Sequence, residues 1–231
     1  MRPPTDWGRQ RFPLAVAVLV SINIAVFAAE VRCDTPGERE AFINAYALIP
    51  FDLTHGVQLD GAPPTLLTLV TSQFFHGSAL HVSSNLLVLL VFGPRVECML
   101  GHGRFVAFYL ACGVLGGIAE LSVTAGSHVP GIGASGAIAG VLGAYVVRFP
   151  THDIATIAPG GCLPAALRVP AFLVIGLWAL AQFAHGFGTL SERVLSEQGG
   201  GTAYFAHIGG FLAGVFLVSF ARGPRTLHHD R

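Results

Sequence analysis

Long apolar segments with few or no charges divide this sequence. The first, residues 12–29, runs for 18 residues without a charged side chain, about the length that a helix needs to cross a bilayer. Further apolar segments follow at residues 79–101, 105–124, 134–147, 169–187 and 204–220. Charged residues are 11% of the chain, whereas soluble domains average about a quarter. The sequence therefore predicts an all-α, polytopic membrane protein, folded as one bundle of six transmembrane helices.

Polar segments mark the expected limits of this bundle. Residues 1–11 and 222–231 are polar and rich in arginine, so we expect a cytoplasmic N-terminal segment, a bundle over residues 12–221 and a cytoplasmic tail. A cleaved signal peptide is the alternative for the first apolar segment, because a basic start and small residues at its end fit that pattern. The length of the segment favours retention in the membrane.

Residues 30–78 separate the first two apolar segments. Such a stretch is too long for a bare connection in a compact protein. Within it, residues 42–48 and 65–75 are apolar but too short to span a bilayer. We therefore expect a long outer loop whose short helices lie in the membrane interface.

Arginine accounts for all 13 basic residues, and its distribution predicts the orientation of the helices. With the N-terminus inside, ten arginines fall in inner segments and three in outer ones, as the positive-inside rule requires. We therefore expect an integral protein of the bacterial inner membrane with both termini in the cytoplasm and the lipid bilayer as its surroundings. The formal net charge is zero, so no nucleic-acid partner is expected. Nothing in the sequence indicates an oligomeric state.

Polar side chains occur near the outer ends of three of the six segments. His81 and Asn85 are four residues apart on one helix face, Ser135 opens the fourth segment, and His207 lies near the start of the last. Any one of them could be only an interhelical hydrogen bond. Because polar groups are costly in hydrocarbon, four at one depth favour a functional site.

Glycines accompany these polar residues. Gly133 and Gly136 flank the serine, while Gly210 and Gly214 share a helix face with His207. Small residues at such spacing let membrane helices approach closely, which by itself would explain a serine as packing. The same approach would bring the Ser135 hydroxyl and the His207 imidazole together.

The chemistry open to these residues is acyl transfer. Serine and histidine supply a nucleophile and a general base, and His81 and Asn85 could donate hydrogen bonds to a tetrahedral oxyanion. No aspartate occurs in an apolar segment, so the base would act without a carboxylate partner. No histidine is followed by glutamate, as a zinc protease helix requires, and we expect neither a metal nor a cofactor.

Two glutamates and one further histidine call for other interpretations. Glu97 and Glu120 are the carboxylates in the segments, and they do not form the pair that an aspartyl-type site requires. We expect Glu120 to make a hydrogen bond between packed helices. His76 precedes the second segment and is expected to face water or headgroups.

The sequence resembles the rhomboid intramembrane serine proteases at these positions. The serine motif Gly-x-Ser-Gly occupies residues 133–136, the last-helix motif Ala-His-x-x-Gly-x-x-x-Gly residues 206–214, and the pattern His-x-x-x-Asn residues 81–85. The resemblance implies a Ser135–His207 dyad and an oxyanion site formed by two side chains together with the Ser135 backbone N–H. It also implies that the fifth helix and residues 188–203 gate the entry of a membrane-protein substrate with a transmembrane helix.

The sequence departs from the rhomboid pattern in two places. Many members place an aromatic residue one turn after the serine, where it stacks on the histidine, and Ala139 stands there in this chain. The tryptophan-arginine pair of the first loop is also missing. We expect an intramembrane serine endopeptidase; the alternatives are an inactive rhomboid-like protein that binds membrane clients, and a small transporter.

Overall fold

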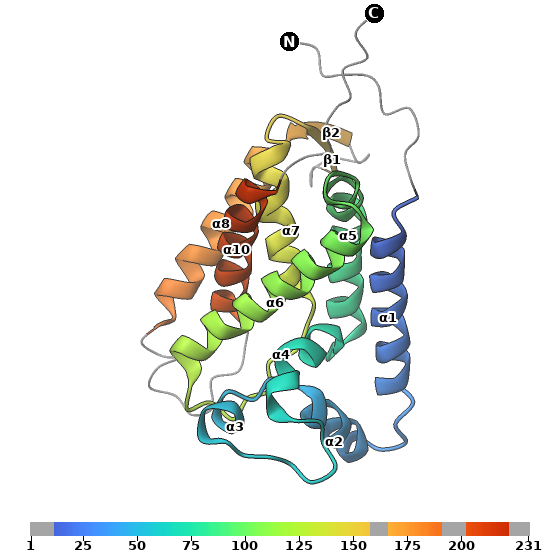
Figure 1. Cartoon of the computed structure of the whole chain (residues 1–231), viewed down its shortest axis with the longest axis vertical. Helices are drawn as coiled ribbons and strands as arrows, with labels where there is room; N and C mark the ends of the chain where they lie inside the picture. Colours follow the sequence, from blue (N-terminus) through green and yellow to red (C-terminus); the bar gives the residue numbers. More distant parts are fainter. Residues whose placement is uncertain (1–11, 158–165, 191–201, 222–231) are drawn as a thin grey trace, which may run out of the picture.

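The computed structural model describes residues 12–157, 166–190 and 202–221 and is mostly helical (Figure 1). Six apolar helices form its bundle. They are α1 (Leu14–Glu30), α5 (Ala79–Leu100), α6 (His102–Thr124), α7 (Ser135–Arg148), α8 (Ala171–Gly188) and α10 (Tyr204–Phe220).

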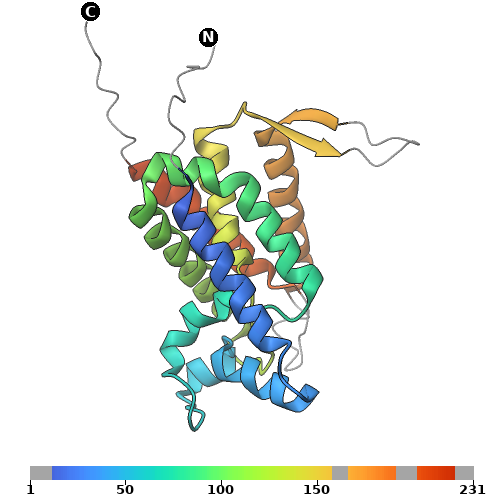
Figure 2. The same ribbon diagram turned by 90° about the vertical axis from the view of Figure 1, so that its right-hand side faces the viewer.

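Helix α7 forms the core of the bundle. Every residue from Gly136 to Tyr145 is buried, because α5, α6, α8 and α10 all pack around this helix. Helix α1 packs on the outside, mainly against α5 (Figures 1 and 2). The start of α1 and the end of α10 lie at one end of the bundle, and residues 31–78 cover the other end.

Three of these helices are long and apolar enough to cross a membrane by length and composition: α5, α6 and α8. Helices α1 and α10 have 17 residues each and α7 has 14. At about 1.5 Å per residue, a helix as short as α7 covers roughly 21 Å of a hydrocarbon core about 30 Å thick. The protein is an integral membrane protein, and six full spans remain an expectation from the sequence.

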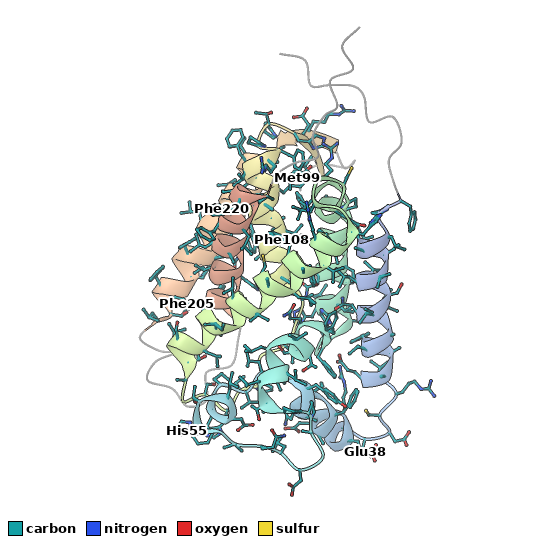
Figure 3. All side chains as sticks on the ribbon, viewed as in Figure 1. Glu38, His55, Met99, Phe108, Phe205 and Phe220 are labelled. Carbon is teal, nitrogen blue, oxygen red and sulfur yellow. The ribbon has the colours of Figure 1, made fainter. Side chains whose placement is uncertain are left out.

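Large apolar side chains cover the outside of the bundle. Leu177 is 68% exposed, and Leu87 and Phe216 are each more than 60% exposed. Soluble proteins rarely expose such a surface, whereas lipid tails solvate it. The aromatic side chain of Phe220 lies near the end of the bundle opposite Glu38 and His55 (Figure 3).

A two-stranded hairpin joins α7 to α8, so the all-α prediction is wrong in this part of the chain. Strand β1 (Asp153–Ile157) pairs antiparallel with β2 (Ala166–Pro170), Asp153 opposite Pro170. Three of the five residues in Asp153–Ile157 are β-branched, which favours an extended backbone. Helix α8 consequently begins at Ala171 rather than at residue 169.

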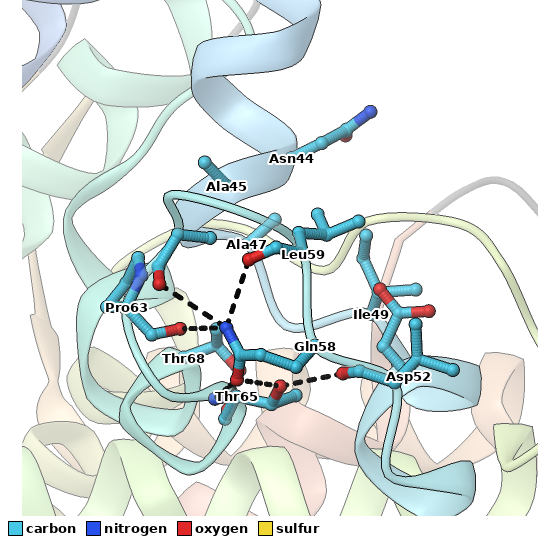
Figure 4. A pocket seen from close by; sticks show the side chains of 12 residues that line it. Asn44, Ala45, Ala47, Ile49, Asp52, Gln58, Leu59, Pro63, Thr65 and Thr68 are labelled. Carbon is cyan, nitrogen blue, oxygen red and sulfur yellow. Dashed lines mark hydrogen bonds between the residues drawn. The ribbon is translucent and has the colours of Figure 1, made fainter.

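Residues 31–78 form short helices, as expected for the outer loop. They are α2 (Pro36–Tyr46), α3 (Pro50–His55), the 3-10 helix η1 (Thr65–Leu67), α4 (Thr68–Thr71) and the 3-10 helix η2 (Ser72–Phe74). Gln58 closes the turn between α3 and η1: its Nε2 donates to the Pro63 carbonyl at 3.0 Å, and its Oε1 accepts from the Thr65 N–H at 3.0 Å (Figure 4). Leu48 pairs through its backbone with Gly131, which attaches this segment to the loop before α7.

A buried carboxylate attaches α1 to the bundle. The two Glu97 carboxylate oxygens accept hydrogen bonds from the backbone N–H groups of Ala15 and Val16, each at 2.8 Å, and Glu97 also contacts His102. N–H groups in the first turn of a helix have no partner within the helix. Glu97 therefore serves as a cap for α1, supplied by α5.

Candidate active site

Helices α7 and α10 touch through backbone atoms. A methyl group on Gly210 would overlap the carbonyl of Gly136, and one on Gly214 would overlap the carbonyl of Gly140. Only glycine permits this distance between the two helix axes. The glycine pattern of the sequence thus corresponds to a real contact, and it fixes the spacing of the residues at the starts of both helices.

Ser135 and His207 face each other across this contact. Ser135 is the first residue of α7, and His207 lies in the first turn of α10. The Ser135 Oγ atom is 2.8 Å from His207 Nε2, within hydrogen-bonding distance. Both side chains are partly buried.

Helix α8 contributes two further contacts to His207. Gln182 Oε1 lies 2.7 Å from His207 Nδ1, and the Trp178 ring centre is 5.9 Å from the imidazole centre at an angle of 38°. A carbonyl oxygen can only accept a hydrogen bond, so a hydrogen bond here requires the proton on Nδ1. In that tautomer, His207 Nε2 accepts from the Ser135 hydroxyl.

Neither of these α8 residues was among the site residues expected from the sequence. The sequence feature that could have identified them is a polar glutamine four residues after a tryptophan in an otherwise apolar segment. This spacing places both side chains on one helix face. Ala139 provides no aromatic ring from α7 to stack on the histidine. Trp178 and Gln182 contact that histidine from another helix instead.

His81 and Asn85 reach the loop that leads into Ser135. Gly133 adopts a φ of 124°, a conformation that other residues rarely adopt. A Cβ atom on Gly133 would lie 2.8 Å from His81 Nε2 and 3.8 Å from Asn85 Nδ2. The two side chains thus lie against the backbone just before Ser135, an approach that a side chain at position 133 would block.

Asn85 carries a buried donor with no acceptor. Asn85 is 7% exposed, and its Nδ2 atom has no hydrogen-bond partner among the residues that the structure describes. Such a group is costly in a folded protein and calls for an explanation. A negatively charged oxygen bound beside Gly133 would supply the missing acceptor.

His76 is buried, contrary to the expectation that it faces water or headgroups. Its backbone N–H donates to Glu30 Oε1 at 2.7 Å, and its ring centre lies 5.0 Å from that of His81. Burial, reinforced by the neighbouring His81, lowers the pKa of His76 to about 4. His76 is therefore neutral at pH 7 and adds no positive charge beside His81.

A cavity of about 50 Å³ adjoins Ser135 and Gly133, between η2, α6 and α10. Its walls include the polar side chains of Ser72, Gln73 and Glu120. Glu120 Oε2 accepts from the Ala206 N–H at 3.0 Å, the interhelical hydrogen bond expected from the sequence. The cavity has room for a few water molecules.

Comparison with known proteins gives one consistent result. The family profile described as the Rhomboid domain matches residues 63–223. The chain is 27% identical over 222 residues to "Rhomboid protein 1, mitochondrial" of Saccharomyces cerevisiae, covering 92% of this chain and 55% of the yeast protein. It is 29% identical over 161 residues to "Presenilin-associated rhomboid-like protein, mitochondrial" of Rattus norvegicus, covering 66% of this chain and 37% of the rat protein.

A plant relative extends the same pattern, and the relatives' names bear on location. The chain is 30% identical over 149 residues to "RHOMBOID-like protein 5" of Arabidopsis thaliana, covering 64% of this chain and 42% of the plant protein. The chain thus spans about half or less of the length of these curated relatives. The mitochondrial names do not fit the bacterial inner membrane expected from the sequence. Because the domain profile matches well over half of the residues, the chain belongs to the rhomboid family.

Proposed function

We propose that this protein is an intramembrane serine endopeptidase that cleaves peptide bonds in or near transmembrane segments of other membrane proteins. The observation that carries the proposal is the 2.8 Å contact between Ser135 Oγ and His207 Nε2. A serine becomes a good nucleophile only where a base can accept its proton. Membership of the rhomboid family supports the same activity.

The reaction needs only Ser135 and His207 for bond making and breaking. Ser135 Oγ attacks the carbonyl carbon of the substrate peptide while its proton passes to His207 Nε2. The carbon–nitrogen bond then breaks, His207 returns the proton to the leaving amine, and the acyl group stays on Ser135. Water, deprotonated by the same imidazole, releases the acyl group and restores the serine.

The oxyanion of the tetrahedral intermediate would lie beside Gly133. His81, Asn85 and the Ser135 backbone N–H are the donors proposed for it. Asn85 Nδ2, which has no partner within the described part of the chain, supports this assignment, because a donor already in place costs no reorganisation during the reaction. Gly133 lets His81 and Asn85 approach the backbone before Ser135, Gly136 lies against Ala206 of α10, and Gly210 and Gly214 keep α10 close enough for the dyad.

The site lies toward the end of the bundle covered by residues 31–78, which we assign to the outer side, with both termini on the cytoplasmic side. Water for the second half of the reaction would come from the cavity next to Ser135. A catalytically inactive client-binding protein is the alternative function. Nothing in the geometry favours it, since the reacting atoms are in contact.

The proposed function is tested by cleavage in proteoliposomes. The purified protein would be reconstituted with a library of synthetic single-span peptides that carry glycine, alanine or proline in the outer half of the helix, and products would be identified by mass spectrometry. We expect some peptides to be cleaved by the parent and none by Ser135→Ala. Identical peptide patterns for parent and variant would contradict the proposal and favour client binding.

A further inference from the structure

We infer that Gln182 is a positioning residue that fixes the tautomer and orientation of His207, so that the site works as a chain of three side chains from α7, α10 and α8. This inference rests on the proposed function and deepens it. The contact that carries it is the 2.7 Å distance between Gln182 Oε1 and His207 Nδ1.

The contact determines which imidazole nitrogen can act as the base. A neutral imidazole has one N–H and one lone pair, and only the nitrogen with the lone pair can take the serine proton. Gln182 Oε1 accepts the Nδ1–H and so leaves the Nε2 lone pair facing Ser135 Oγ. In the opposite tautomer, Nδ1 and the glutamine oxygen would face each other as two acceptors. That arrangement is repulsive and is therefore disfavoured.

Gln182 also retains its hydrogen bond throughout the reaction. When Nε2 takes the serine proton, the imidazolium carries hydrogens on both nitrogens, and the Nδ1–H still points at the glutamine oxygen. A hydrogen bond from a charged donor is stronger than one from a neutral donor. The contact therefore stabilises the protonated histidine more than the neutral one, which helps the proton transfer.

Glutamine suits this position in a membrane helix. A carboxylate would hold the same proton more strongly, but a charge on α8 would be costly near the bilayer core. The carboxamide orients the imidazole without that cost. Trp178, one turn earlier on α8, contacts the imidazole ring as well, so α8 holds His207 at two points.

The first test measures how fast a fluorophosphonate probe labels Ser135 as a function of pH. Gln182→Met removes the acceptor at similar volume and should slow labelling about 3- to 10-fold, the rate equivalent of one hydrogen bond. Gln182→Glu keeps an acceptor. Its negative charge should restore labelling and move the acid limb of the profile to higher pH, because it favours the imidazolium. Leu180→Met, on the exposed side of α8, is the matched control and should behave like the parent.

A second test measures the tautomer of His207 directly and does not depend on enzymatic activity. In detergent, the ¹⁵N chemical shifts of His207, assigned by comparison with His207→Ala, should show a protonated Nδ1 in the parent and a mixture of tautomers in Gln182→Met. The inference is overturned if Gln182→Met keeps the parent's tautomer. A second pattern would overturn it equally. In that pattern, labelling of Ser135 still depends on His207, but Gln182→Met and Gln182→Glu slow labelling to the same extent and the acid limb of the pH profile does not move. A parent that shows the expected tautomer but never labels would contradict the proposed function and not the role of Gln182.

Discussion

The proposed reactivity of the Ser135 hydroxyl depends on side chains from three other helices. His207 contacts it from α10, Gln182 orients His207 from α8, and His81 and Asn85 border the adjacent loop from α5. Each polar residue alone could be an interhelical hydrogen bond. Their meeting around one serine supports catalysis, and the Asn85 Nδ2 donor beside it has no partner among the residues that the structure describes.

The first prediction concerns the oxyanion donors. His81→Ala and Asn85→Ala should each slow turnover, because a donor to the developing negative charge is lost. Loss of one such donor costs about 100- to 1000-fold where it has been measured, and the remaining donors could reduce the effect. The readout is the cleavage rate of a peptide from the proteoliposome library.

Ser83→Ala is the matched control for the oxyanion variants, since Ser83 lies on the same helix with an exposed side chain. It should cleave at the parent rate. If His81→Ala, Asn85→Ala and the double variant also do so, then these two residues do not bind the oxyanion.

The second prediction concerns pH and His76. The folded protein holds His76 neutral with a pKa of about 4, whereas the ordinary value is 6.5, so the unfolded chain binds a proton first as the pH falls. The contribution of neutral His76 to the stability of the fold is complete above pH 6.5 and is lost progressively as the pH falls toward 4. The loss should be about 3 kcal/mol in the free energy of unfolding.

His76→Gln tests this pH dependence, because glutamine does not titrate. Unfolding of the parent and of the variant would be followed in detergent between pH 7 and pH 4. The difference in stability between the two proteins should change in favour of the variant as the pH falls. A difference that stays constant with pH would show that His76 is not the buried neutral group.

At the scale of helices, the contact between α7 and α10 sets the distance across the dyad. The third prediction is that Gly210→Ala lowers both stability and activity, since its methyl group would overlap the Gly136 carbonyl. Forcing a methyl group into a packed contact costs about 1 to 3 kcal/mol. Thermal unfolding in detergent and probe labelling of Ser135 are the measurements.

Gly176→Ala is the control for this helix contact, because a Cβ atom at Gly176 meets nothing within 4 Å. Alanine favours a helix over glycine, so this variant should be as stable as the parent or slightly more stable. Equal behaviour of the two alanine variants would mean that the α7–α10 contact tolerates a side chain and does not control the dyad.

The lengths of the apolar segments in the sequence predicted the helices of the bundle well. The last helix, Tyr204–Phe220, coincides with the predicted segment, and α5 and α7 agree to within about one residue. The hairpin between α7 and α8 could not be predicted in this way. Its strands Asp153–Ile157 and Ala166–Pro170 are short, and the preference of a residue for a strand depends strongly on its surroundings.

At the scale of the whole molecule, the fold brings together residues that the sequence could only place at similar depth. Ser135, His207, His81 and Asn85 were predictable because each lies in the first two turns of a helix that enters from the same side. Gln182 was not, since it lies more than halfway along α8, a helix that runs in the opposite direction, and its partner depends on how that helix is rotated. The burial of His76 likewise depends on Glu30 and the outer segment folding over it.

The central claim is that Ser135 and His207 form a reactive pair, and labelling with a fluorophosphonate probe tests it most directly. The purified parent should be labelled at Ser135, and Ser135→Ala should remove the label. His207→Ala should label much more slowly although its serine hydroxyl is intact, because no base then accepts the proton. Mass spectrometry would locate the label. Equal labelling rates for the parent and His207→Ala, or a label on another serine, would contradict the account.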